Sequence, residues 1–172
     1  SISTPMEVGH KHRKEDMPAV VDAKRRGIAQ HTLGIAGWIC QMTVPEAMYA
    51  WSYLAQYTSN PNEAIIKYIK RIFRYFKGLL DNDVEGLYFT PLEKLHVPHF
   101  GPVRLNQLYG YVDCTHILEE RSVSRYGMFF SINGMMIMAL SKKMTYVTLS
   151  ATESKYVGLS EAIKFALLFM IY

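Results

Sequence analysis

The sequence has little cysteine, no long apolar run and no common catalytic or phosphate-binding motif, and each absence excludes a class of protein. Cys40 and Cys114 are the only cysteines and have no metal-type spacing, which argues against a disulfide scaffold or a zinc fold. The most apolar run, residues 165–172, is too short to cross a bilayer. The polar first residues do not resemble a signal peptide. We therefore expect a soluble intracellular protein, cytoplasmic or nuclear, with no membrane partner.

Composition favours a folded chain with a basic first half. Hydrophobic residues make up 49% and charged residues 20% of 172 residues, enough apolar material for one or two small domains with packed cores. The net charge of +4 is uneven, because residues 1–80 carry 11 Lys and Arg against 6 Asp and Glu, whereas residues 81–172 carry 8 against 9. A basic half favours a polyanionic partner without identifying one.

The first half has the pattern of a linker followed by helices. Residues 1–27 are polar and contain Gly and Pro, which predicts a linker. Helices are expected over 28–42, over 46–57 after Pro45, and from an N-cap at Asn62 to a C-cap at Gly78. Residues 28–80 would form one helical unit.

After residue 80 the pattern is typical of strands and then of a helix. Residues 81–104 are expected to form a connecting strand, 84–90, and a loop. Strands are predicted over 105–114, 126–132 and 135–140, with a hairpin turn at Asn133-Gly134. Residues 151–172 have a helical period, and one stripe consists of Tyr156, Leu159, Ile163, Ala166 and Met170. The expected fold class is α+β.

The third helix has a cationic face opposite an apolar one. Its apolar positions recur at core-facing spacing, at Ile65, Ile69, Ile72 and Phe76. Five cations recur at spacings of three or four and lie on the other face: Lys67, Lys70, Arg71, Arg74 and Lys77. A phosphate backbone would relieve their mutual repulsion, although a solvated helix face remains the alternative.

Three segments resemble, in order, the end of copia-type (Pseudoviridae) retrotransposon Pol polyproteins. Residues 37–61 contain the strings GWI, TVPE, SYL and SNP, similar to that family's "VGSLLYLA…TRPDIAYAVSYLSRF.SNP". Residues 70–78, KRIFRYFKG, resemble "KRILRYLKG". Residues 141–156 resemble "SSKKQPTVALSSTEAEY", with identical spacing from the two lysines to the tyrosine. Matches cover nearly the whole chain and are weak over residues 91–108 and 114–120.

This resemblance implies a particular organisation and chemistry. The first half would be the reverse-transcriptase thumb and connection, and residues 105–172 would be the N-terminal half of a ribonuclease H domain, with three antiparallel strands and one helix. The parent polyprotein performs RNA-templated DNA synthesis. Its ribonuclease H cleaves the RNA strand of RNA–DNA hybrids with two Mg²⁺ ions, which are hard cations held by carboxylates.

The resemblance also indicates that this site is incomplete. Asp113 matches the family's first metal-binding aspartate in "GYSDADWA". The glutamate of "TEAEY" is replaced by Lys155, whose positive charge opposes divalent cations. Glu153, two residues earlier, would point to nearly the opposite side of the helix. We instead expect it to support the start of the helix, near a cap at Ser150 or Thr152.

The sequence thus predicts a fragment of a retrotransposon reverse transcriptase/ribonuclease H that is catalytically inactive, with Asp113 vestigial and no Mg²⁺ bound productively. The family's remaining aspartates would lie beyond residue 172, and the polymerase aspartates before residue 1. The alternative function is a non-catalytic nucleic-acid-binding module retained for its basic helix. A further expectation is self-association, through the truncated edge of the sheet at 105–114 and the apolar residues 165–171.

Overall fold

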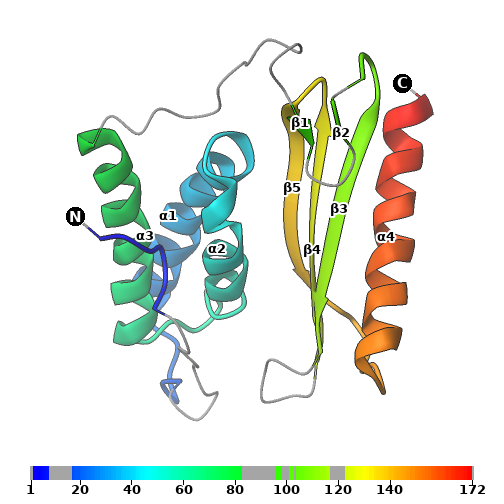
Figure 1. The fold of residues 1–172 in the computed structure, drawn as a ribbon. Helices are drawn as coiled ribbons and strands as arrows, with labels where there is room; N and C mark the ends of the chain where they lie inside the picture. The colour runs from blue at the N-terminus through cyan, green and yellow to red at the C-terminus, as the bar shows by residue number, and fades with distance from the viewer. Residues whose placement is uncertain are drawn as a thin grey trace. The chain divides into compact units, whose positions relative to one another are not determined.

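A computed structural model describes residues 2–7, 17–82, 96–97, 101–102, 104–116 and 123–171. The chain divides into two compact units, Ser1–Gly86 and Leu87–Tyr172, each with its own core. The first unit is helical, and the second is a three-stranded antiparallel sheet with one C-terminal helix (Figure 1). This confirms the α+β class.

The helical unit contains α1 (Ala23–Met42), a short 3-10 turn η2 (Pro45–Ala47), α2 (Met48–Ala55) and α3 (Glu63–Asp81). The helix α1 begins at Ala23, before the predicted residue 28, because the Asp22 side chain accepts a hydrogen bond from the Arg25 backbone N–H at 3.0 Å and caps the first turn. The predicted linker 1–27 is therefore wrong for residues 23–27, where Gly27 lies inside the helix.

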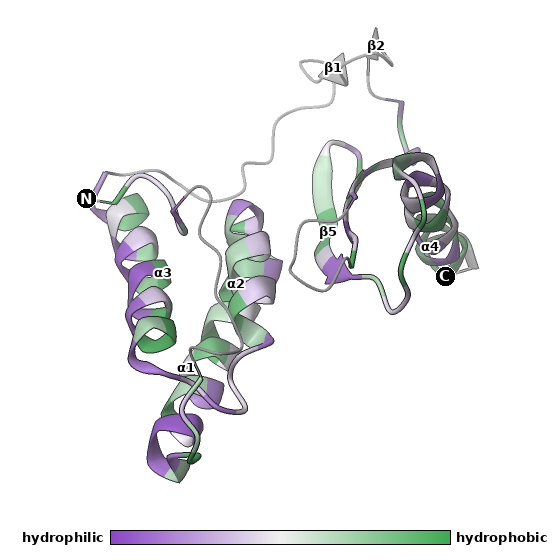
Figure 2. Cartoon of the chain, turned by 90° about the horizontal axis from the view of Figure 1, so that it is seen from below, coloured by the Kyte–Doolittle hydropathy of each residue, from purple (hydrophilic) through white to green (hydrophobic). Residues whose placement is uncertain are grey.

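The helix α3 begins where the sequence predicts and ends three residues later. Asn62 is the N-cap, and its side chain accepts from the Ile65 N–H at 2.9 Å. Gly78 is not the C-cap, because the helix continues to Asp81 and the Asn82 side chain donates to the Gly78 carbonyl at 2.6 Å. The apolar face is buried as predicted, at Ile65, Ile69, Ile72 and Phe76. In Figure 2 the hydrophilic positions of α3 lie on its outer side.

The second unit is built on the strand order β3–β4–β5. Its strands are β3 (Leu108–Thr115), β4 (Arg125–Ile132) and β5 (Met135–Lys143), all antiparallel. The hairpin at Asn133-Gly134 is confirmed, and both residues have positive φ, 52° and 76°, as a type I′ turn requires. The predicted loop at 91–104 also contains a short antiparallel pair, β1 (His96–Val97) with β2 (Gly101–Pro102). The predicted strand 84–90 lies outside the described residues.

The helix α4 (Ala151–Ile171) packs on β3 and β4 through a ridge of small residues. Ser154, Gly158 and Ala162 are buried at spacings of four, which brings the helix close to the sheet. A Cβ on Gly158 would lie 2.1 Å from the Cys114 Sγ, so only glycine fits this approach. Phe169 contacts Phe130 with ring centroids 5.7 Å apart.

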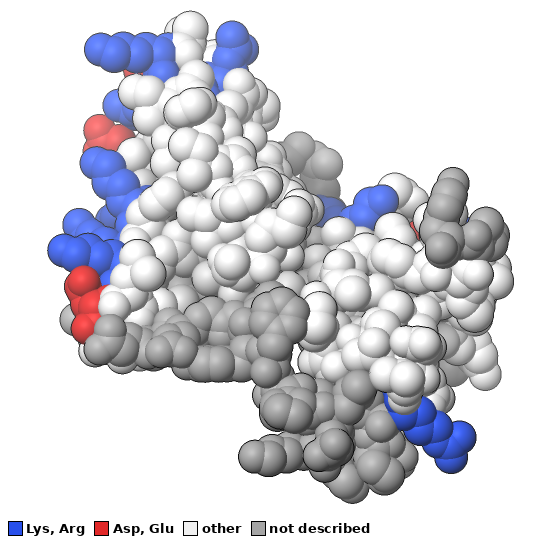
Figure 3. Space-filling model, turned by 90° about the horizontal axis from the view of Figure 1, so that it is seen from above, with Lys and Arg blue, Asp and Glu red and all other residues white. Residues whose placement is uncertain are grey.

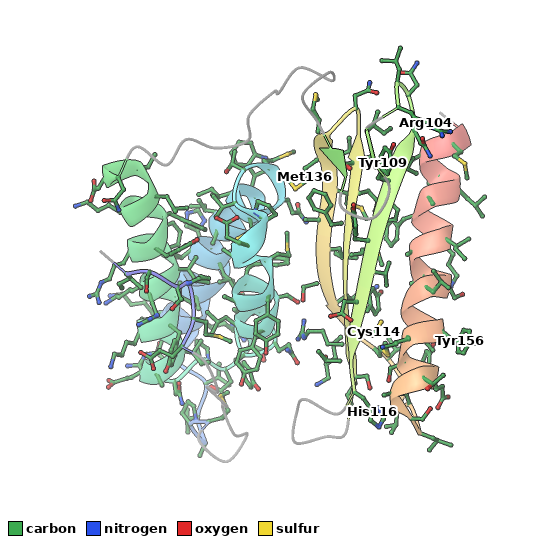
Figure 4. All side chains as sticks on the ribbon, in the orientation of Figure 1. Arg104, Tyr109, Cys114, His116, Met136 and Tyr156 are labelled. Carbon is green, nitrogen blue, oxygen red and sulfur yellow. The ribbon has the colours of Figure 1, made fainter. Side chains whose placement is uncertain are left out.

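The outer face of α4 is also apolar. Tyr156 is 69% exposed, and Leu159 and Ile163 are each 50% exposed. Figure 4 shows Tyr156 pointing away from the sheet. The sequence predicts self-association through the uncovered apolar residues 165–171. That expectation is wrong for Phe165 and Phe169, which pack against the sheet core, whereas Leu167, Leu168 and Met170 are exposed. Among the described helices none combines the length and hydropathy that a membrane span needs.

Candidate nucleic-acid interface

Four of the five predicted cations are exposed on α3. Lys67, Lys70, Arg74 and Lys77 all project into solvent, opposite the buried isoleucines. Figure 3 shows Lys and Arg side chains gathered along the α3 side of the helical unit, with a few acidic side chains among them. The amphipathic period places these cations on one face because residues three and four apart are neighbours on a helix.

Arg71 differs from the other four, because the N-terminal segment engages it. Its Nη1 lies 3.0 Å from the Glu7 Oε1, and its Nη2 donates to the Thr4 hydroxyl at 3.3 Å. The Tyr68 hydroxyl donates to the other Glu7 oxygen at 3.2 Å. The Arg71 side chain is only 22% exposed. The predicted five-cation face is therefore a four-cation face, with Arg71 committed to an internal ion pair.

A hollow of about 400 Å³ opens beside this face. The helix α3 contributes most of its lining, and Arg25 of α1 joins it. Arg25 lies 3.8 Å from the Asp22 carboxylate and 3.6 Å from the Glu63 carboxylate. Sequence reasoning missed Arg25, because only the packing of α1 against α3 brings it beside residues some forty positions away. The lining residues are Arg25, Glu63, Ile66, Lys67, Lys70 and Arg74.

Within the part of the chain that the structure describes, no carboxylate cluster surrounds Asp113. Val112 and Cys114 both face α4 at Gly158, so strand alternation turns Asp113 toward the opposite face of the sheet. The exposed Asp113 side chain accepts from the Cys114 backbone N–H at 2.8 Å. Lys155 is exposed on α4, the helix that covers the other face.

The resemblance implies a two-Mg²⁺ site, which makes a definite demand on the surroundings of Asp113. Two divalent ions need several oxygen ligands that converge from different elements. Among the described residues no three His, Cys, Asp or Glu side chains gather in this way, and Lys155 stands where the resemblance expects the second ligand. Glu153 acts at the start of α4 as predicted: its backbone N–H donates to the Ser150 Oγ at 3.0 Å, and its carboxylate accepts from the Leu149 N–H.

A buried hydroxyl cluster near the end of β3 was not predicted. Ser124, Thr148 and Ser154 are almost fully buried, and their oxygens lie 2.6–3.1 Å from one another. The His116 Nδ1 lies 3.2 Å from both the Thr148 and Ser154 oxygens, and Figure 4 shows His116 beside the start of α4. Because the hydroxyls are closed to solvent, they cannot attack a substrate. The cluster joins β3, β4 and α4.

The fold and the site together define an α+β protein with an exposed cationic helix. The chain belongs to the family of the secreted RxLR effector protein 161 of Plasmopara viticola. It is 31% identical to that protein over 133 residues, which cover 76% of this chain and 82% of the relative. No protein-family model matches the chain, and no solved structure gives a significant match.

Proposed function

We propose that the chain is a non-catalytic nucleic-acid-binding module descended from a copia-type reverse transcriptase/ribonuclease H. The observation that carries the proposal is the row of exposed cations on α3, at Lys67, Lys70, Arg74 and Lys77. Their spacing lets them meet successive phosphates without reading bases, so binding would be independent of sequence. The preferred partner is an RNA–DNA hybrid, the substrate that the resemblance implies.

The second unit supports the same descent. The order of three antiparallel strands followed by a helix agrees with the first half of a ribonuclease H-like domain, which we propose as its fold. Its chemistry is lost, because Lys155 stands where the resemblance expects a carboxylate and Asp113 points away from α4. We therefore expect no Mg²⁺-dependent cleavage of hybrids, and none after Lys155→Glu alone.

Fluorescence anisotropy with a labelled RNA–DNA hybrid at several salt concentrations tests the binding. Changing Lys67, Lys70 and Arg74 together to Gln should weaken binding strongly and lower the salt slope by about three, one for each lost phosphate contact. The matched control changes Lys142, Lys155 and Lys164, exposed cations of the second unit, to Gln. An equal loss of affinity in both triple variants would show that only net charge matters. Separately, Mg²⁺-dependent cleavage of the hybrid that Asp113→Asn abolishes would refute the non-catalytic assignment.

The match to a secreted effector favours a second candidate function. This chain would then act outside the cell that makes it. Immunodetection of the native protein in culture medium and in cell extracts distinguishes the two candidates. Protein confined to the cells would reject the effector function, and protein confined to the medium would remove intracellular hybrids as a partner.

A further inference from the structure

The hollow between α1 and α3 concentrates positive charge that neither helix provides alone. Arg25 comes from the first turn of α1, whereas Lys67, Lys70 and Arg74 come from the exposed side of α3. One carboxylate, Glu63, and one apolar side chain, Ile66, complete the lining. Its volume of about 400 Å³ lies within the range of sites that bind small ligands, about 300–1,000 Å³.

Arg25 is held loosely at this position. Its Nε lies 3.8 Å from Asp22 and its Nη2 lies 3.6 Å from Glu63. A charge-assisted hydrogen bond between such groups is typically about 2.7–2.9 Å long. The two carboxylates therefore orient the guanidinium without saturating its five donors. Glu63 is the internal competitor for any anion that enters the hollow.

We propose that this hollow binds a phosphodiester group of the nucleic-acid backbone and that Arg25 is a binding residue. The inference rests on the proposed nucleic-acid binding and makes it more specific. The guanidinium fork suits two phosphate oxygens at once, and the lysines supply point charges around it. A polymer offers further phosphates for Lys77, one turn along α3 from Arg74. Contacts from two helices would fix the direction of a duplex relative to α3.

Three consecutive cations of α1 provide a matched test. Lys24, Arg25 and Arg26 lie in one turn, and only Arg25 lines the hollow. Each alanine variant removes one positive charge. With the hybrid at about 0.15 M salt, where the Debye length is about 8 Å, Arg25→Ala should weaken binding about tenfold and lower the salt slope by about one. Lys24→Ala and Arg26→Ala should change the affinity less than about twofold, because diffuse charge is screened.

Glu63→Gln gives a second measurement in the opposite direction. Removing the competing carboxylate should strengthen hybrid binding several-fold while all the cations stay in place. Circular dichroism checks that each variant is folded. If Arg25→Ala is misfolded, the affinity of Glu63→Gln for the hybrid tests the inference instead. An affinity of Glu63→Gln that is unchanged or weaker than that of the parent overturns the inference.

The outcomes separate this inference from the function on which it rests. In one result, the α3 triple variant loses binding while the three α1 variants all have equal effects. That result overturns the inference about Arg25 but leaves the proposed function standing. An α3 triple variant that binds like the parent overturns both. Competition experiments distinguish the ligands. Unlabelled hybrid should displace the labelled hybrid more effectively, per charge, than inorganic phosphate or poly-glutamate does. If either of these competitors is equally effective, the assignment to a phosphodiester backbone is overturned.

Discussion

Two glycines of α1 have different surroundings, although both lie inside the helix. A Cβ on Gly37 would lie 2.6 Å from the Trp51 indole, whose Nε1 is fixed by a 2.8 Å hydrogen bond to the Leu33 carbonyl. Gly34 has no neighbour within 4 Å of such a Cβ. Gly37→Ala should therefore destabilise the unit by about 1–3 kcal/mol through overpacking, whereas Gly34→Ala should stabilise it by about 0.5–1 kcal/mol.

Urea unfolding followed by tryptophan fluorescence measures this difference, because both tryptophans, Trp38 and Trp51, lie in the helical unit. Equal changes in the two variants would contradict the close contact between Gly37 and the indole.

Glu7 decides how many cations α3 presents. Its carboxylate binds Arg71 and Tyr68, so Glu7→Gln should release Arg71 to bind phosphate. We expect a several-fold higher affinity for the hybrid and a salt slope steeper by about one. Glu161→Gln, with the same change in net charge in the other unit, is the control. If the control raises the affinity for the hybrid by the same factor, the release of Arg71 does not contribute to binding.

At the scale of elements, local signals in the sequence predict helices and turns better than the ends and faces of helices. The start of α3 and the hairpin at Asn133-Gly134 depend on neighbouring residues and were predicted. The end of α3 was not, because Gly78 continues the helix under the cap that Asn82 supplies. The period of α4 predicted a helix, but its buried face is the ridge at Ser154, Gly158 and Ala162. A helix apolar on both sides does not reveal its inner face by periodicity.

The candidate site was predicted only where one element supplies it. The exposed cations of α3 follow from a single helical period. The contact between Glu7 and Arg71 joins residues 64 positions apart, and the entry of Arg25 into the hollow depends on how α1 packs. Neither leaves a periodic signal in the sequence, because both arise from tertiary packing.

The helices α1 and α3 also make the stability of the helical unit sensitive to alkaline pH. Burial first, and the Glu46 carboxylate second, raise the pKa of Cys40 from 9.0 to about 12. Burial also raises the pKa of Tyr68 and of Tyr75. Because the folded state then holds more protons than the unfolded one, stability should be complete below about pH 9 and fall as the pH rises toward 12.

Urea unfolding at pH 8, 9, 10 and 11 measures this decline. Cys40→Ala should be less stable at pH 8 because of its cavity, but its stability should fall less steeply with pH. Parallel curves for the two proteins would exclude Cys40 as a source of the decline.

At the scale of the whole molecule, the sheet of the second unit has β3 and β5 at its edges within the described residues, and β3 is the edge that the sequence predicts to associate. Within the described residues β3 pairs only with β4, which leaves its other side able to accept a strand of a second copy. We predict self-association that increases with concentration and survives Leu159→Glu with Ile163→Glu on α4, since strand pairing uses the backbone. Size-exclusion chromatography with light scattering tests this. A protein that stays monomeric at every concentration refutes the prediction. If the double variant no longer self-associates, the contact is made by α4 and not by β3.

The buried hydroxyls of Ser124, Thr148 and Ser154 also constrain how this family can diverge. Each oxygen is the partner of the other two and of the His116 Nδ1. Losing one removes a hydrogen bond from each of the remaining two, and a net hydrogen bond is worth about 0.5–1.5 kcal/mol. Replacing all of them by apolar groups of similar shape can be nearly neutral. Single substitutions should therefore be selected against while joint substitutions persist, and relatives should keep the three hydroxyls together or have lost them together.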